Sequence, residues 1–147
     1  MQAVQPAAES NGLRLHVSLG DACIIDADRA RIRQIVGNLL SNAIKFTPAG
    51  GLIELTSSVH DGFATLAVRD SGRGIEPSIL PHIFERFQQA KSAELGGLGL
   101  GLTIVRHLVE MHGGDVRAQS EGAGKGATFT AGAQDSRFPD PFCRAAC

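Results

Sequence analysis

The sequence contains few cysteines, almost no net charge and no long apolar run, and each of these shortages excludes a class of protein. Its 3 cysteines are an odd number, and neither Cys143 nor Cys147 has a histidine or a second cysteine pair nearby to complete a zinc site. Cys23 lies in an apolar run, so we expect it to be a buried thiol. The cysteine pattern is therefore typical of a reduced, cytoplasmic protein without a structural metal.

The charge and the apolar pattern exclude further partners. A formal net charge of −1 argues against nucleic acid or an anionic membrane as the main partner. No apolar run approaches the roughly 20 residues that a membrane-spanning helix needs, and the N-terminus lacks a signal-peptide pattern. We expect a cytoplasmic chain with no nucleic-acid and no direct membrane contact, and membrane anchoring of a parent protein stays open.

The length of 147 residues is enough for one domain with a substantial hydrophobic core. Residues 1–10, rich in Ala and Gln, are expected to form a linker or a helical stub. The domain itself is expected over residues 11–133. Residues 134–147 carry Pro, Asp and Arg without periodicity, so we expect a disordered tail there.

Hydrophobic periodicity predicts strands and helices along most of the chain. Residues 13–19 alternate between apolar and polar, as in a half-buried strand, and residues 23–25 suggest a second short strand. A long helix follows, with Asp26 or Asp28 as its N-cap. It ends at Phe46-Thr47-Pro48. The remaining expected elements are a hairpin over Leu52–Val59 and Phe63–Arg69, a short apolar helix over Pro81–Gln89, a helix over Leu102–Met111, and a hairpin over Val116–Gln119 and Ala127–Thr130.

This order of elements predicts an α+β fold. Antiparallel hairpins separated by helices are typical of a mixed, mostly antiparallel sheet with helices on one face, which is a two-layer α/β sandwich. Apolar residues of the long helix recur at 3.6-residue spacing, and this face is expected to cover the sheet. They are Ile32, Ile35, Val36, Leu39 and Ala43.

A second stripe of the long helix carries an unusual choice of polar residues. Asn38 and Asn42 lie one turn apart, and Lys45 follows three residues later. Asparagine is a poor helix former, and an ordinary solvated face would carry Lys, Glu or Gln. The stripe is therefore a candidate source of an oxygen ligand and a positive charge, with an ordinary polar helix face as the alternative.

Two glycine clusters flank the middle of the chain. The first, Asp70–Ile75, follows a predicted strand, and the second, Gly96–Gly101, runs directly into a predicted helix. A helix N-terminus gathers unpaired backbone N–H groups and the positive end of the helix dipole, so the second cluster is expected to bind an anion such as a nucleotide phosphate. For Asp70 a simple turn role stays open.

Other phosphate-binding motifs fit these glycines poorly. Gly97, Gly99 and Gly101 have the wrong spacing for the dinucleotide-binding fingerprint, and no predicted strand precedes them. Gly124-Lys125-Gly126 lacks the upstream glycine and the hydroxyl residue of a P-loop. The protein-kinase motifs His-Arg-Asp and Asp-Phe-Gly are absent from the sequence.

Four segments, taken in order, resemble the motifs of the catalytic domain of sensor histidine kinases. Residues 38–46, Asn-Leu-Leu-Ser-Asn-Ala-Ile-Lys-Phe, resemble the N box, and residues 70–75, Asp-Ser-Gly-Arg-Gly-Ile, the first glycine box. Residues 83–87, Ile-Phe-Glu-Arg-Phe, resemble the F box, and residues 97–102, Gly-Leu-Gly-Leu-Gly-Leu, the second glycine box. The resemblance covers about Leu13 to Thr130 and implies the Bergerat-type fold, with an ATP lid, that gyrase, Hsp90, histidine kinases and MutL share.

The resemblance implies roles in binding ATP and Mg²⁺. Asp70 would accept a hydrogen bond from the adenine N6 amino group, where guanine presents a carbonyl oxygen instead. Asn42 would place its amide oxygen on Mg²⁺, a hard cation that prefers oxygen ligands. Phe84, Arg86 and Phe87 of the F box would anchor the lid by packing. The other implied ATP-binding residues are Asn38, Lys45, Phe46, Gly72, Gly74, Ile75, Gly97, Gly99, Leu100 and Gly101.

The resemblance also implies phosphoryl transfer rather than hydrolysis. Relatives that hydrolyse ATP carry Glu one turn before the metal-binding asparagine, whereas this chain has Asn38, which cannot take a proton at neutral pH. No acceptor is present, because none of the 5 histidines is followed by Glu or Asp on a predicted helix. The expected partners are therefore a histidine-bearing dimerisation domain, to which the γ-phosphoryl passes, and indirectly a response regulator.

Two departures from the family pattern keep other functions open. Residues 91–95, Lys-Ser-Ala-Glu-Leu, lack the usual lid arginines, so Arg86 or Lys91 would have to contact the γ-phosphate. Ala127 stands where many relatives place a hydroxyl near the adenine. The alternatives are a degenerate nucleotide-sensing module that transfers nothing and an ATP hydrolase of the same superfamily.

Overall fold

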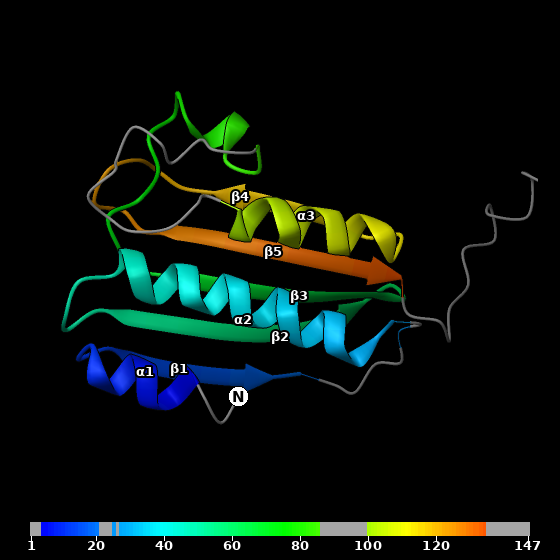
Figure 1. Ribbon diagram of the computed structural model, residues 1–147, viewed down its shortest axis with the longest axis horizontal. Coiled ribbons are helices and arrows are strands. Elements are labelled where there is room, and N and C mark those ends of the chain that lie inside the picture. Colours follow the sequence, from blue (N-terminus) through cyan, green and yellow to red (C-terminus); the bar gives the residue numbers. More distant parts are fainter. Residues whose placement is uncertain (1–3, 21–24, 26, 86–99, 135–147) are drawn as a thin grey trace, which may run out of the picture.

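The computed structural model describes residues 4–20, 25, 27–85 and 100–134. Its helices and strands follow one another in a simple order along the chain (Figure 1). They are α1 (Val4–Ser10), β1 (Arg14–Leu19), α2 (Arg29–Phe46), β2 (Leu52–His60), β3 (Phe63–Asp70), the 3-10 helix η1 (Leu80–His82), α3 (Gly101–Met111), β4 (Asp115–Gln119) and β5 (Ala127–Gln134).

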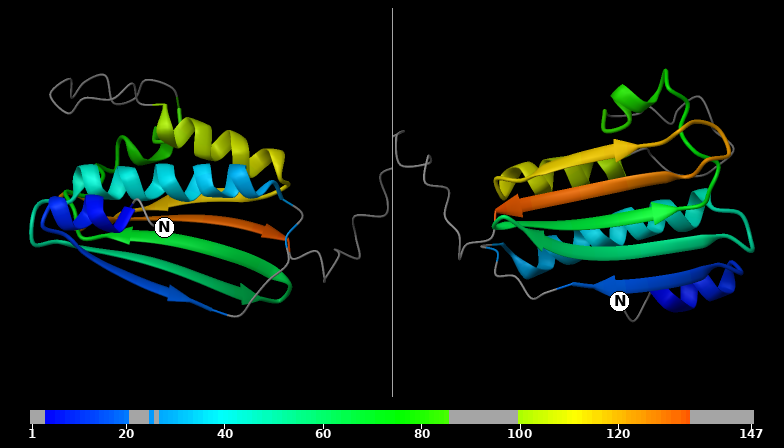
Figure 2. Two further views of the ribbon diagram at one scale, coloured as in Figure 1. Left: turned by 60° about the horizontal axis from the view of Figure 1, so that its bottom comes forward. Right: turned by 180° about the vertical axis from the view of Figure 1, so that it is seen from behind.

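The strands form one five-stranded sheet in the order β1-β2-β3-β5-β4. β1 and β2 pair in parallel, and the other three pairs are antiparallel. Helices α2 and α3 lie on one face of this sheet, and the view from behind shows the other face without a helix over it (Figure 2). The predicted α+β two-layer sandwich is confirmed.

Helix α2 begins and ends where its sequence predicts. Asp28 is the N-cap, and its side chain accepts a hydrogen bond from the Ala30 backbone N–H at 2.7 Å. At the other end the Thr47 hydroxyl donates to the Ala43 carbonyl at 2.6 Å. The predicted apolar face packs on the sheet, and Leu40, which the prediction left out, is also buried there.

The core lies between the two helices and the sheet. Alternate residues of the strands point into it, as the period of two in a strand requires. A large apolar side chain stabilises the fold by about 1.5–3 kcal/mol when it is fully buried. The largest fully buried side chains are Phe129, Leu39, Leu40, Ile53, Leu55, Val68 and Val105.

Among the described residues, the end of the sandwich where α2 begins and α3 ends is hollowed and partly open to solvent. A cavity of about 590 Å³ lies there between the two helices and the paired ends of β3 and β5. The strands contribute short side chains to its lining, among them Ala64, Ala131 and Ala133. Ala64 and Ala133 stand opposite each other in the sheet, so both strands leave space at the same level.

The structure differs from the predicted elements in three places. β5 continues to Gln134 because Ala131–Gln134 pair with Phe63–Leu66 of β3, although small residues give no strand signal of their own. The expected helix Pro81–Gln89 appears in its described part only as the 3-10 helix η1, since so short a run cannot sustain an α-helix alone. Of the expected strand 23–25 only Ile25 is described, and it lies outside any helix or strand.

Candidate functional site

Four segments meet at the end of the sandwich opposite the cavity (Figure 1). They are the end of α2, the segment that follows β3, the turn between β4 and β5, and the start of α3. Helices α2 and α3 run antiparallel, so the last turn of one and the first turn of the other come to the same end. The described residues of the N box and of the two glycine boxes thereby lie toward the same end of the sandwich.

Asp70 is the last residue of β3 and is only 5% exposed. Its Oδ1 accepts a hydrogen bond from the Gly72 backbone N–H at 2.9 Å. Burial raises the pKa of the Asp70 carboxyl, and hydrogen bonds from the backbone N–H groups of Gly72 and Ala127 partly oppose that rise. The site thus has a fixed, poorly hydrated acceptor that an incoming N–H donor would stabilise.

The loop after Asp70 needs glycine at two positions. A Cβ atom on Gly72 would collide with the backbone carbonyl of Phe46. Gly74 has φ of +73°, and a Cβ atom there would collide with the carbonyl of Gly122. These glycines allow the loop to approach both the end of α2 and the β4–β5 turn.

Backbone hydrogen bonds hold this loop in place on both sides. The Arg73 N–H donates to the Phe46 carbonyl at the end of α2 at 3.1 Å, and the Arg73 carbonyl accepts from the Gly124 N–H at 2.7 Å. The Ser120 hydroxyl accepts from the Ile75 N–H at 3.0 Å and donates to the Gly126 carbonyl at 2.7 Å. Ser120 was not predicted as a site residue, since its role depends on a turn 45 residues away from Ile75.

Two cations lie close to the Phe46 ring. The Arg73 guanidinium is 4.1 Å from the centre of the Phe46 ring, and the Lys45 ammonium is 5.2 Å from it. The sequence analysis named Lys45 and Phe46 but overlooked Arg73, although Arg73 stands inside the first glycine box. The structure therefore adds a second positive charge next to the predicted phosphate-binding lysine.

Asn38 of α2 lies beside the start of α3. The Asn38 Nδ2 group donates to the Gly101 carbonyl at 3.4 Å. The side-chain oxygen of Asn38 is an acceptor and takes no part in this bond. Asn42 follows one turn later and is half-buried. Helix α3 begins at Gly101, and its N-cap residue Leu100 makes no side-chain cap hydrogen bond. The first backbone N–H groups of a helix have no partner within the helix. Asn38 and Gly101 are thus joined directly, and the binding roles expected of Asn38, Asn42, Leu100 and Gly101 stay predictions.

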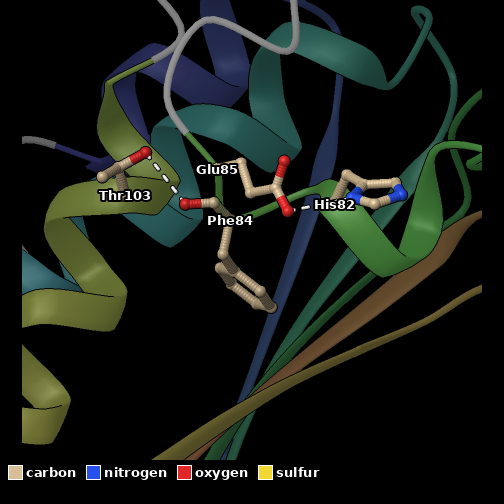
Figure 3. Close-up of polar contacts among 4 residues, drawn as sticks. All are labelled: His82, Phe84, Glu85 and Thr103. Carbon is tan, nitrogen blue, oxygen red and sulfur yellow. Dashed lines mark hydrogen bonds and ion pairs between the residues drawn. The ribbon is translucent and has the colours of Figure 1, made fainter.

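The F-box segment is joined to the same region. The Phe84 ring packs edge-on against the Phe129 ring in the core, with 6.2 Å between ring centres and 85° between planes. The Phe84 carbonyl accepts a hydrogen bond from the Thr103 hydroxyl at 3.0 Å (Figure 3). The packing role predicted for Phe84 agrees with this geometry. The predicted site residues Arg86, Phe87, Gly97 and Gly99, and the candidate Lys91, lie outside the described residues.

The described residues contain no preformed metal-binding cluster of His, Cys, Asp or Glu side chains. In that part of the chain no group of three or more His, Cys, Asp or Glu side chains could hold a metal ion. A cation at this site would therefore depend on amide oxygens and on oxygens brought by a ligand. Likewise, none of the helices in the described ranges combines the length and the apolarity needed to cross a bilayer.

Sequence comparison identifies relatives of the chain. The family model "Histidine kinase-, DNA gyrase B-, and HSP90-like ATPase" matches residues 27–136. The chain is 42% identical over 135 residues to the autoinducer 2 sensor kinase/phosphatase LuxQ of Vibrio vulnificus strain YJ016, which covers 85% of the chain and 16% of LuxQ. It is 45% identical over 103 residues to the histidine protein kinase DivJ of Caulobacter vibrioides, covering 68% of the chain and 17% of DivJ. The chain spans about a sixth of the length of these relatives.

Solved structures show the same fold. Full-length ShkA in complex with AMPPNP matches with a TM-score of 0.79 and 37% identity, over 90% of this chain and 27% of that chain. The catalytic domain of the histidine kinase ThkA matches with a TM-score of 0.77 and 27% identity, over 89% of this chain and 86% of that one. The second match spans nearly the whole of an isolated catalytic domain.

Proposed function

The chain belongs to the family of histidine kinase-, DNA gyrase B- and HSP90-like ATPases and is a catalytic ATP-binding domain of the sensor histidine kinase type, and from this premise we propose how its residues bind ATP and pass on a phosphoryl group. One observation carries the proposal. The buried Asp70 lies at the same end of the sandwich as the asparagines of α2 and the uncapped start of α3.

Asp70 recognises the adenine base. Its carboxylate accepts a hydrogen bond from the N6 amino group, which lowers the cost of burying the charge. Guanine would present a carbonyl oxygen to the same acceptor and would be rejected. Gly72, Gly74, Ile75 and Phe46 surround the base, since the loop that carries the glycines is fastened to the end of α2.

The phosphates bind between α2 and α3. The backbone N–H groups of Leu100 and Gly101 bind the phosphate oxygens at a helix N-terminus, where negative charge is favoured. Gly97 and Gly99, which lie outside the described residues, are proposed to take part in this binding. Lys45, in the last turn of α2, adds a positive charge for the phosphates.

Mg²⁺ would be held by the amide oxygen of Asn42, with Asn38 one turn away. The donor set fits, because amide oxygens suit a hard cation that keeps several waters and shares phosphate oxygens. Bound there, the ion would neutralise charge on the phosphates.

The reaction is phosphoryl transfer to a histidine of a separate dimerisation domain. Asn38 occupies the position of the hydrolytic base, and an amide cannot accept a proton from water at neutral pH. The chain therefore holds ATP until another domain supplies the nucleophile. A parent protein with such a domain, acting on a response regulator, is the proposed setting, and residues 1–10 would be the link to it.

Replacing Asp70 tests the adenine assignment. We expect Asp70→Asn to weaken binding of Mg-AMP-PNP about ten- to a hundredfold in calorimetric titration, as the loss of a hydrogen bond to a buried charge predicts. Asp61→Asn, in the exposed turn at the other end of β3, is the matched control and should bind like the parent chain. An Asp70→Asn variant with parental affinity would exclude this role.

Phosphotransfer is tested by mixing the chain with a dimerisation domain from a histidine kinase and γ-labelled ATP. The proposal predicts an acid-labile phosphohistidine on that domain. Binding of ATP without any labelled histidine would favour the sensing module. Sustained release of phosphate by the chain alone would favour the hydrolase.

A further inference from the structure

Thr103 is the third residue of α3, and its hydroxyl bonds to a different segment of the chain. The Oγ1–H group donates to the backbone carbonyl of Phe84, 19 residues earlier, at 3.0 Å (Figure 3). Threonine hydroxyls within helices commonly bond to a carbonyl one turn back in the same helix. The bond to Phe84 instead joins the first turn of α3 to the F-box segment.

The position of the Phe84 backbone carbonyl is restrained by contacts on both sides of it. The Phe84 ring packs against Phe129, which is 2% exposed in the core. The next residue is tied back to η1, because the Glu85 N–H donates to the His82 carbonyl at 2.9 Å and the two side chains pair at 2.9 Å (Figure 3). The acceptor that Thr103 uses therefore has its place set by the core and by η1.

The first turn of α3 is held from a second side as well. The Asn38 amide of α2 donates to the Gly101 carbonyl at 3.4 Å, and Leu102 is 4% exposed against the core. The Asn38 contact is long for a hydrogen bond. The shorter bond from Thr103 is thus the better-defined polar restraint on this turn.

We propose that Thr103 is a positioning residue for nucleotide binding, which holds the first turn of α3 where its backbone N–H groups meet the phosphates. The inference rests on the proposed function, which places the phosphates at the start of α3. Thr103 itself contacts neither nucleotide nor metal. Its loss should weaken binding of the phosphates and leave binding of the base unchanged.

Two variants at this position separate the hydroxyl from the side-chain shape. Thr103→Val keeps the branched shape and removes the donor, and we expect the Kd for Mg-AMP-PNP to rise about three- to tenfold, the range for one neutral hydrogen bond. Thr103→Ser keeps the donor and should bind within about twofold of the parent chain. Adenosine, which lacks phosphates, should bind both variants like the parent in a titration followed by amide chemical shifts.

Each contrary outcome points to a different failure. Parental affinity of Thr103→Val for Mg-AMP-PNP would overturn the positioning role, and so would a failure of Thr103→Ser to restore affinity. An equal loss of adenosine and AMP-PNP binding would show a general packing role and would also overturn it. If the parent chain itself bound no Mg-AMP-PNP, the proposed function would fail first and this inference with it.

Discussion

At the scale of single residues, Asp70 links ligand choice to stability. Burial raises the pKa of this carboxyl, so the folded chain holds the proton more tightly than the unfolded chain does. The free energy of unfolding therefore falls as pH rises from the ordinary aspartate pKa of about 4 through the raised value, and stays lower above it. A ligand that donates to the carboxylate recovers part of this loss.

The fall in the free energy of unfolding with rising pH gives a prediction for Asp70→Asn. The melting temperature of the variant minus that of the parent should increase as pH is raised from 4 to 7, because only the parent takes on the buried charge. Scanning calorimetry at several pH values measures it, with Asp61→Asn as the control. A difference that stays constant over this range would contradict the raised pKa.

Asn42 gives a second prediction at this scale. Asn42→Ala should make binding of AMP-PNP nearly independent of Mg²⁺, because the amide oxygen that would hold the ion is gone. Titrations with and without Mg²⁺ measure the effect in both proteins. Ser41→Ala, one residue away and exposed, is the control, and an Asn42→Ala variant that keeps the parental Mg²⁺ dependence would remove the metal assignment.

At the scale of elements, the sequence predicts most of the helices and strands but few of the contacts between them. Capping residues and periodicity locate α2, and alternation locates β2 and β3. Arg73, Ser120 and Thr103 act through partners that lie far along the chain or outside any periodic pattern. Local pattern carries no information about such partners, so the structure was needed to find them.

The loop after β3 gives the prediction for this scale. Gly74 and Gly124 have φ of +73° and +74°, so alanine at either position costs about 1 kcal/mol in backbone strain. Only at Gly74 would the new Cβ atom also collide with the Gly122 carbonyl. We expect Gly74→Ala to lose clearly more stability in urea unfolding and to bind AMP-PNP poorly, with Gly124→Ala binding normally. Equal losses for the two variants would contradict the close approach.

At the scale of the whole molecule, the two ends of the sandwich differ in how they are filled. The site end is closed by backbone hydrogen bonds among loops, whereas the other end holds the cavity, to which β3 and β5 contribute short side chains. Ala131→Val should fill part of this space and raise the free energy of unfolding by about 1 kcal/mol. Ala67→Val, a residue of β3 outside the cavity lining, controls for the strand propensity of valine and should gain less. Equal gains would indicate that the cavity is not the cause.

The fold was predictable from the sequence, whereas the binding roles of the site residues stay predictions. The periodicity of the strands and helices predicts the layers, and four segments that resemble the motifs of one family occur in order along the chain. The cavity and the extension of β5 were not predictable, because alanine and glycine give no signal for the partner they meet. What such residues face depends on the assembled sheet.

The hydrogen bond from the Arg73 N–H to the Phe46 carbonyl joins the loop after Asp70 to the last turn of α2. This hydrogen bond therefore fixes the position of the proposed adenine-binding loop relative to the helix that carries the asparagines. In heavy water, the Arg73 amide should exchange its proton about as slowly as the core amides of α2. The binding surface would then keep its shape between successive ligands, and each new nucleotide would meet a surface already assembled.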